Sequence, residues 1–166
     1  VGRFACQLAV ISGAKVFGVS RRIGLHKQLK EDGVEPAGVF ADMAEARDAG
    51  PFDVIFDSVG GDTLSLALRS LARGGVCINC GNSARQLTSF DAIELYRSGG
   101  ARLLSVWLGT ERPEDCKAAL VRLANLVAEG RLRAPIDAVL PWTEVEQAAA
   151  RLIGRGVDGK LVLEVA

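Results

Sequence analysis

The chain has 166 residues, of which 49% are hydrophobic and 5% aromatic, and its 20 basic residues balance 20 acidic ones. With zero formal net charge it has no broad cationic face, so we expect neither a nucleic-acid partner nor binding to a membrane surface. No apolar run approaches the roughly 20 residues that span a bilayer, and residues 1–10 lack a signal-peptide pattern. We therefore expect a soluble, cytoplasmic protein.

Short apolar runs alternate with helical patterns along the first 109 residues, and glycine or aspartate bounds most runs. Apolar spacings of three and four residues predict helices, and short runs rich in Val, Ile and Leu predict buried strands. In chain order the predicted elements are a helix over 1–12, a strand over 15–20, a helix over 25–32, strands over 38–41 and 52–57, a helix over 62–71, and strands over 75–80 and 102–108. This alternation predicts an α/β fold built on a doubly wound parallel sheet.

The pattern changes after Gly109. Pro113 begins a long amphipathic helix that reaches Gly130, and further apolar stretches, a helix over about 143–153 and a strand over 160–165 follow. We expect this tail to leave the strand–helix alternation. The expected division is one domain over 1–109 and a segment over 110–166 that serves another layer or domain.

In open doubly wound sheets the ligand binds beyond the carboxyl ends of the strands. The chain opens directly into a helix at Gly2, with no strand and no glycine-rich turn before it. We therefore expect the sheet to lack its first strand and the chain to begin inside that turn. The N–H groups at the start of this helix, beside Gly2, would then be the seat of a pyrophosphate.

About 20 residues past such a turn, dinucleotide-binding folds place an Asp or Glu that binds the ribose 2′-hydroxyl and repels a 2′-phosphate. Counting from Gly2 leads to Ser20, Arg21 and Arg22, which offer a hydroxyl and two guanidiniums but no carboxylate. These groups suit a 2′-phosphate and predict NADP(H) as the cofactor, with Lys27 as a further candidate. The alternative is that the two arginines belong to a solvated turn.

Two further strand ends carry small and polar residues, DSVGGDT at 57–63 and CGNSA at 80–84. Small residues let the backbone approach a flat ligand closely, and Ser58, Asn82 and Ser83 offer hydrogen bonds. The alternative is two ordinary turns between strand and helix. Asp57 is expected to order its turn and not to exchange protons.

The cysteines and the single histidine point to no metal site. Cys77 and Cys80 are three residues apart in a predicted strand, so they point to opposite faces and suit neither a chelate nor a redox loop. We expect reduced thiols. His26 lies in a predicted surface helix and is expected to be neither a catalytic base nor a ligand. Trp107, at a predicted strand end, is a candidate border of the nicotinamide pocket.

Five segments in order, VGRFACQLA, DVIFDSVGGDTL, LARGGVCINCGNS, GRLRAPIDAVLPW and GVDGKLVLEV, resemble the medium-chain dehydrogenase/reductase superfamily, most closely its zinc-free quinone oxidoreductase branch. In that family a turn of the form AxxGGVG precedes the first helix, and Val1 and Gly2 match its last two residues. The resemblance implies a Rossmann domain over 1–109 that lacks its first strand. It also implies that 110–166 returns to a GroES-like catalytic domain that precedes the chain.

The resemblance also implies roles for individual residues. Ser20 and nearby basic residues would bind the 2′-phosphate, and Arg155 matches a position where some relatives contact the cofactor. A tyrosine that often assists at the phosphate is Ala41 here.

On the other side of the cofactor, the resemblance places Ser58 and Val59 along the adenosine and ribose. It places Cys80, Gly81 and Asn82 near the nicotinamide. It assigns no catalytic residue within the chain.

The function implied is an oxidoreductase that transfers hydride from NADPH to a quinone or an activated alkene or carbonyl, with a small-molecule substrate and, at full length, a homodimer. One alternative is a zinc-dependent alcohol dehydrogenase with the same cofactor half. Another is a non-catalytic NADPH-binding sensor or structural protein. Residues 1–166 alone are expected to be inactive and to bind the cofactor poorly.

Overall fold

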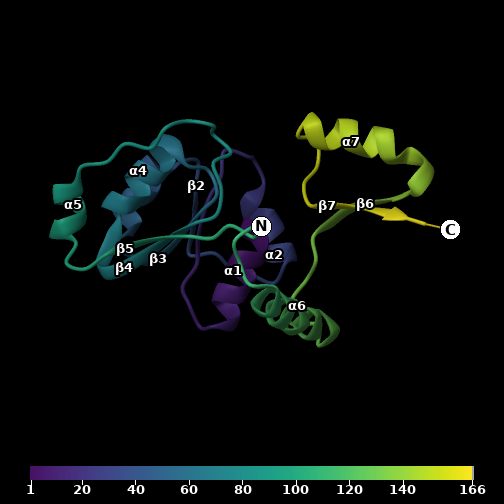
Figure 1. Cartoon of the computed structure of the whole chain (residues 1–166), viewed down its shortest axis with the longest axis horizontal. Coiled ribbons are helices and arrows are strands. Elements are labelled where there is room, and N and C mark those ends of the chain that lie inside the picture. The colour runs from purple at the N-terminus through teal and green to yellow at the C-terminus, as the bar shows by residue number, and fades with distance from the viewer. Residues whose placement is uncertain (166) are drawn as a thin grey trace. The chain divides into compact units, whose positions relative to one another are not determined.

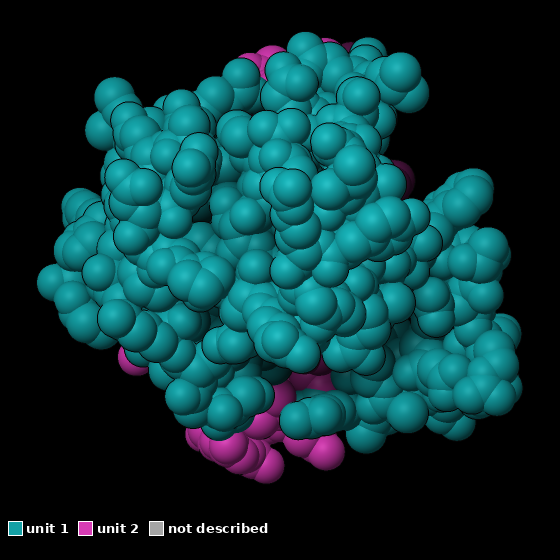
Figure 2. Space-filling view, turned by 90° about the vertical axis from the view of Figure 1, so that its left-hand side faces the viewer, with its two compact units in different colours: residues 1–122 teal, residues 123–166 magenta. Residues whose placement is uncertain are grey.

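The computed structural model describes residues 1–165. The chain divides into two compact units, residues 1–122 and residues 123–166 (Figure 2). We expected a domain boundary near residue 110. The helix Pro113–Ala128 begins shortly after that residue and passes from one unit into the other. The domain boundary at residue 110 stays a prediction. No helix in the described part of the chain combines the length and the apolar character needed to cross a bilayer.

The first unit is built from alternating helices and strands (Figure 1). In chain order these are α1 (Gly2–Ile11), β1 (Phe17–Val19), α2 (Leu25–Glu31), β2 (Gly38–Phe40), α3 (Met43–Ala46), the 3-10 turn η1 (Arg47–Ala49), β3 (Phe52–Asp57), α4 (Gly61–Arg69), β4 (Leu71–Asn79), α5 (Ala92–Arg97), β5 (Arg102–Ser105) and α6 (Pro113–Ala128), which continues into the second unit.

The strands of this unit form two parallel pieces of sheet. β1 pairs with β2, and β4 lies between β3 and β5. Within the described residues neither β1 nor β3 has a hydrogen-bonded partner on its other edge. The ring of Phe17 meets the ring of Phe52 edge-on at 5.4 Å, so the first residues of β1 and β3 are neighbours. The predicted α/β fold with parallel strands is confirmed.

Two apolar clusters hold the unit together. The larger lies where α4 packs along β3 and β4 (Figure 1), and its buried members include Leu64, Leu68 and Cys77. The smaller joins α2 to β1 through Leu29 and Val16. Each fully buried aliphatic side chain contributes about 1.5–3 kcal/mol, so these clusters fix the helices against the strands.

Several elements differ from the sequence-based prediction. β4 begins at Leu71, where the prediction still had a helix, because Leu71 pairs with Phe52 at the start of β3. β5 ends at Ser105, three residues before the predicted end of that strand. α3 and α5 were not predicted. Aspartates cap both short helices, since Asp42 and Asp91 accept hydrogen bonds from backbone N–H groups in the first turns.

The second unit contains β6 (Ile136–Pro141), the 3-10 turn η2 (Trp142–Glu144), α7 (Val145–Ile153) and β7 (Lys160–Glu164). β6 and β7 are parallel, and α7 connects them. The expectation that this tail leaves the strand–helix alternation is therefore wrong within the unit. An ion pair of 2.6 Å between Arg151 and Asp137 ties α7 to β6.

Candidate functional site

The predicted site residues of the first unit follow the carboxyl ends of β1, β3 and β4. Asp57 pairs with Asn79 in the register of β3 and β4, so both strands end at one edge of the sheet. Val19 pairs with Phe40 in the same way at the ends of β1 and β2. Beyond these ends the chain turns, and the side chains predicted to bind the cofactor lie in those turns.

A hollow of about 370 Å³ lies beyond β1 and β2. Its lining includes the three residues that the sequence singled out, together with the end of β2 and the start of α2. The lining residues are Ser20, Arg21, Arg22, Ile23, Gly24, Leu25, His26, Val39, Phe40 and Ala41. The lining includes two guanidinium groups and no carboxylate, a composition that suits an anion.

Ser20 fixes the turn that carries the two arginines. Its N–H donates to the carbonyl of Phe40 at 3.0 Å, and its hydroxyl oxygen accepts from the N–H of Arg22 at 3.1 Å. Arg21 is exposed and forms no ion pair within residues 1–165. The turn thus presents a guanidinium that residues 1–165 do not neutralise.

Two residues of α2 were also considered for this site. Lys27 does not line the hollow, and its ammonium lies 3.8 Å from the carboxylate of Glu31, one turn along α2. His26 is exposed, as expected of a surface histidine, and it also lines the hollow. No signal in the sequence shows which face of this short helix turns toward β2.

The turns after β3 and β4 are joined along their length. The N–H of Cys80 donates to the carbonyl of Asp57 at 2.9 Å, and that of Ala84 donates to the carbonyl of Val59 at 2.9 Å. Between them the N–H of Ser83 donates to the carbonyl of Ser58 at 3.3 Å. These bonds bring together the residues that the resemblance assigned to the ribose and the nicotinamide.

Glycines allow the two turns to lie this close. A Cβ atom on Gly81 would stand 3.0 Å from the carbonyl oxygen of Ser58, and a Cβ on Gly60 would stand 2.6 Å from Oδ1 of Asn82. Gly60 also has a φ of +75°, which side chains rarely adopt. The small residues predicted at these strand ends are therefore required by the packing of the turns themselves.

The thiols near this edge are protonated at neutral pH. Burial, reinforced by the negative charge of Asp57, raises the pKa of Cys77 to about 11. Burial also raises the pKa of Cys80, and the charge of Asp57 adds to this rise. Residues 1–165 contain no group of three or more His, Cys, Asp or Glu side chains placed to hold a metal ion.

The predicted anion seat at Gly2 lies at the start of α1. The first turn of this helix contains no acidic residue. Arg3 anchors this end to the end of α2 through a two-pronged ion pair with Asp32, at 2.5 and 2.6 Å. The role of Gly2 stays a prediction.

Two further candidates, Trp107 and Arg155, follow β5 and α7 along the chain. Arg155 follows α7 in the second unit, with a φ of +55°, and its contact with a cofactor stays a prediction. Trp107 was expected to end a strand, but it lies beyond β5 in a turn closed by Thr110, and 74% of it is exposed.

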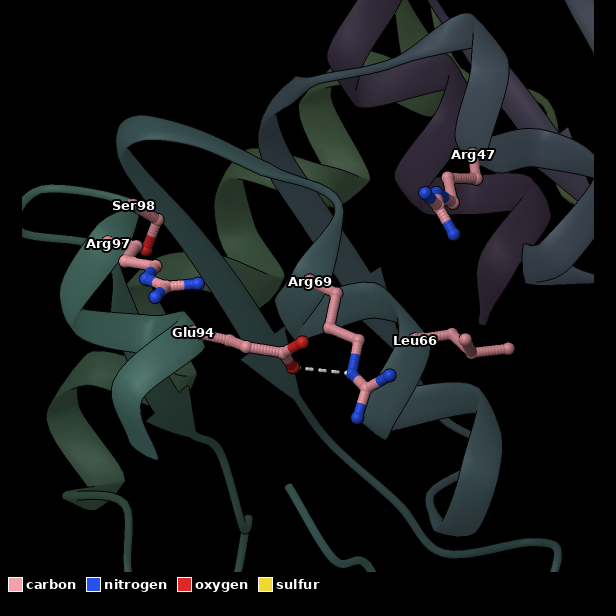
Figure 3. Close-up of a pocket in the computed structure, with 6 residues that line it drawn as sticks. All are labelled: Arg47, Leu66, Arg69, Glu94, Arg97 and Ser98. Carbon is pink, nitrogen blue, oxygen red and sulfur yellow. Dashed lines mark ion pairs between the residues drawn. The ribbon is translucent and has the colours of Figure 1, made fainter. Parts of the chain in front are cut away.

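A second hollow of about 380 Å³ lies elsewhere in the first unit (Figure 3). It is lined by Arg47, Leu66, Arg69, Glu94, Arg97 and Ser98. These residues precede β3, β4 and β5, so the hollow lies toward the amino ends of parallel strands, away from the candidate site. Figure 3 shows the pairing of Arg69 with Glu94, which joins α4 to α5 at 2.6 Å. Arg69 and Arg97 also lie in the last turns of α4 and α5, where a positive charge interacts favourably with the helix dipole.

Comparison with known proteins gives the family. A protein-family model described as zinc-binding dehydrogenase matches residues 35–163. The quinone oxidoreductase of Pseudomonas aeruginosa is 27% identical over 171 residues, covering 98% of this chain and 53% of that protein. The human mitochondrial enoyl-[acyl-carrier-protein] reductase is 26% identical over 182 residues, covering 98% and 47%. The chain therefore spans about half the length of these curated relatives.

Solved structures agree with this assignment. The crystal structure of the Escherichia coli quinone oxidoreductase complexed with NADPH matches 98% of this chain and 53% of its own, with a TM-score of 0.76 and 25% identity. Since the family model covers most of the chain and the fold is shared, the chain belongs to the zinc-binding dehydrogenase family, within the medium-chain dehydrogenases/reductases.

Proposed function

We propose that the chain is the cofactor-binding part of an oxidoreductase that transfers hydride from NADPH to a quinone or an activated alkene or carbonyl. The observation that carries this proposal is the hollow beyond β1, which Ser20, Arg21 and Arg22 line without a carboxylate. A carboxylate there would bind a ribose hydroxyl and repel a 2′-phosphate, whereas two guanidiniums attract the phosphate.

The relatives support the acceptor class. Two of those compared are quinone oxidoreductases, one of them in complex with NADPH, and a third is an enoyl reductase, whose name denotes reduction of an activated alkene. These are the functions of proteins that share 25–27% of aligned residues with this chain. The proposal extends them to the protein to which this chain belongs.

The residues present fit an NADP(H) molecule laid along the strand ends. Ser20, Arg21 and Arg22 would hold the 2′-phosphate, and Ser58 and Val59 would lie along the ribose. The close turn at Cys80, Gly81 and Asn82 would receive the nicotinamide. The cofactor contact of Arg155 rests on the resemblance alone. When bound, NADPH supplies the hydride, and this chain supplies orientation and keeps water away.

The test compares the two nicotinamide cofactors on the intact protein, including any part that flanks residues 1–166. With a benzoquinone acceptor, we expect kcat/KM for NADPH to exceed that for NADH by at least about 10-fold, the worth of one charge-assisted hydrogen bond. Equal use of the two cofactors would contradict the assignment of the hollow. Binding of NADPH without turnover across quinone, enal and enone acceptors would favour a sensor or structural role.

A zinc-dependent alcohol dehydrogenase is the second candidate, and the description of the matching family as zinc-binding favours it. Metal analysis of the intact protein separates the two candidates. A stoichiometric zinc whose removal abolishes oxidation of alcohols would support this candidate, and full quinone reductase activity after treatment with a chelator would contradict it.

We also propose that the intact protein is a homodimer. β5 is an edge strand of its piece of sheet, and Leu103 and Leu104 on it are 40% and 48% exposed. An exposed apolar edge invites pairing with a second strand. Light scattering coupled to size exclusion should give twice the monomer mass, and a monomer at micromolar concentration would overturn this part of the proposal.

A further inference from the structure

A carboxylate is buried at the point where the turns after β3 and β4 meet. Asp57 is the last residue of β3 and only 4% of it is exposed. Within residues 1–165 it forms no ion pair. Burying a charge without a counter-ion is costly unless hydrogen bonds replace the lost water, so the donors around this carboxylate must compensate its charge.

Three donors surround the carboxylate. The N–H of Val59 reaches Oδ1 at 3.2 Å, the N–H of Gly60 reaches Oδ2 at 3.0 Å, and the side-chain amide of Asn79 reaches Oδ2 at 2.7 Å. Gly60 immediately precedes α4, so the positive end of that helix also faces Asp57. The start of α4 is thus occupied by the protein's own carboxylate.

Asn79 connects Asp57 to the turn after β4. Its amide nitrogen also donates to the carbonyl of Gly81 at 2.9 Å. One buried carboxylate therefore fixes the backbone at Val59 and Gly60 directly and at Gly81 through Asn79. These positions include both turns that face the cofactor under the proposed function. The sequence did not single out Asn79, because its role depends on the register that sets it opposite Asp57.

We propose that Asp57 is a positioning residue, which acts through Asn79 to hold the turns after β3 and β4 in the one arrangement that receives the ribose and nicotinamide of the cofactor. This inference rests on the proposed function. In this role Asp57 would contact no cofactor atom and transfer no proton. Asp57 holds the two strand ends as one rigid surface in the free protein, so that cofactor binding costs little conformational entropy.

The decisive variant is D57N in the intact protein. Asparagine keeps the size of the side chain but turns one acceptor into a donor, which then faces the amide of Asn79 or a backbone N–H. The matched control is D53N, the same chemical change near the other end of β3, where Asp53 is exposed. Titration calorimetry with NADPH and with NADH gives both the dissociation constant and the fraction of protein that binds.

We expect D57N to raise the dissociation constants of NADPH and NADH by the same factor, at least about 10-fold. The free protein would relax away from the binding arrangement to satisfy the new donor, and cofactor binding would have to restore that arrangement at the cost of an unsatisfied buried donor. The ratio between the cofactors should stay within about 2-fold of wild type, because that ratio depends on the hollow beyond β1. D53N should behave as wild type. A purely structural role would instead lower the binding fraction and leave the dissociation constant unchanged.

N79A keeps the inference testable if D57N does not fold. It removes the link to Gly81 while Asp57 keeps its backbone donors, so we expect a rise in the NADPH dissociation constant of about 3- to 10-fold. Unchanged dissociation constants in both variants, or in N79A alone if only it folds, would overturn the inference. If the wild-type protein binds neither cofactor, the proposed function itself has failed.

Discussion

The turn after β1 and the turns after β3 and β4 are both proposed to bind the cofactor, but different interactions hold them in place. The first is exposed, held by the hydroxyl of Ser20, and presents Arg21 to solvent. The others are tied by backbone bonds and by a carboxylate that is 4% exposed. Under the proposed function, the exposed turn would select between NADPH and NADH, and the buried network would fix where the cofactor lies.

This difference shows how a change in each region should act. A residue of the exposed turn can be replaced without disturbing the core, so its loss changes preference and leaves stability intact. A residue of the buried network supports both the fold and the surface at once. The four predictions below test this division, starting with the largest expected effect.

Replacing Gly60 with alanine should lower the free energy of unfolding by about 3 kcal/mol, because the alanine would have to adopt a positive φ and its Cβ would clash with Asn82. Gly74 is the matched control. It has a similar φ of +71° with open space around it, so G74A should cost only about 1 kcal/mol. Urea unfolding measures both variants, and equal losses would show that the two turns do not depend on their close approach.

The buried thiol of Cys77 should lower the free energy of unfolding at alkaline pH. The folded thiol keeps its proton up to about pH 11, whereas the unfolded thiol loses it near its ordinary pKa of 9.0. The folded state therefore binds more protons between these values, and stability falls across this range by on the order of 2 kcal/mol. Urea unfolding of wild type and C77A at pH 7, 9 and 11 isolates this effect. A constant difference between the two proteins would contradict it.

R21A should raise the dissociation constant of NADPH by about 10-fold and leave that of NADH unchanged. The reason is that the guanidinium lines the hollow without a counter-ion within residues 1–165. K27A serves as control, since Lys27 lies outside the hollow and faces Glu31. A loss of affinity for both cofactors in R21A would place the arginine in the general binding surface and remove its role in selection.

E94Q should have the smallest effect. It breaks the pair with Arg69, whose side chains are 39% and 48% exposed, so we expect a loss of about 0.5 kcal/mol in unfolding free energy. Affinity for NADPH should not change, because this pair lies toward the amino ends of the strands. E111Q, at an exposed glutamate without an ion pair in the described chain, is the control. Weaker binding of NADPH in E94Q would contradict the prediction that the cofactor binds at the carboxyl ends of the strands and not at their amino ends.

The sequence predicted the part of this site that depends on local pattern. The count from Gly2 led to Ser20, which lies in the lining of the hollow beyond β1. The role of Asn79 and the position of His26 in that lining were not predicted, since they depend on strand register and on the rotation of a short helix. The parallel pairing of β6 with β7 was also not predicted, because short apolar runs do not reveal which strands are neighbours.

The division of the first unit into two pieces of sheet has a consequence for how its turns are coupled. Among the described residues, β1 and β2 share no ladder hydrogen bond with β3, β4 and β5. The rings of Phe17 and Phe52 meet at the first residues of β1 and β3, whereas the candidate binding turns follow the other ends of these strands. Within residues 1–165 no ladder hydrogen bond therefore transmits a displacement of the turn at Ser20 to the turns after β3 and β4.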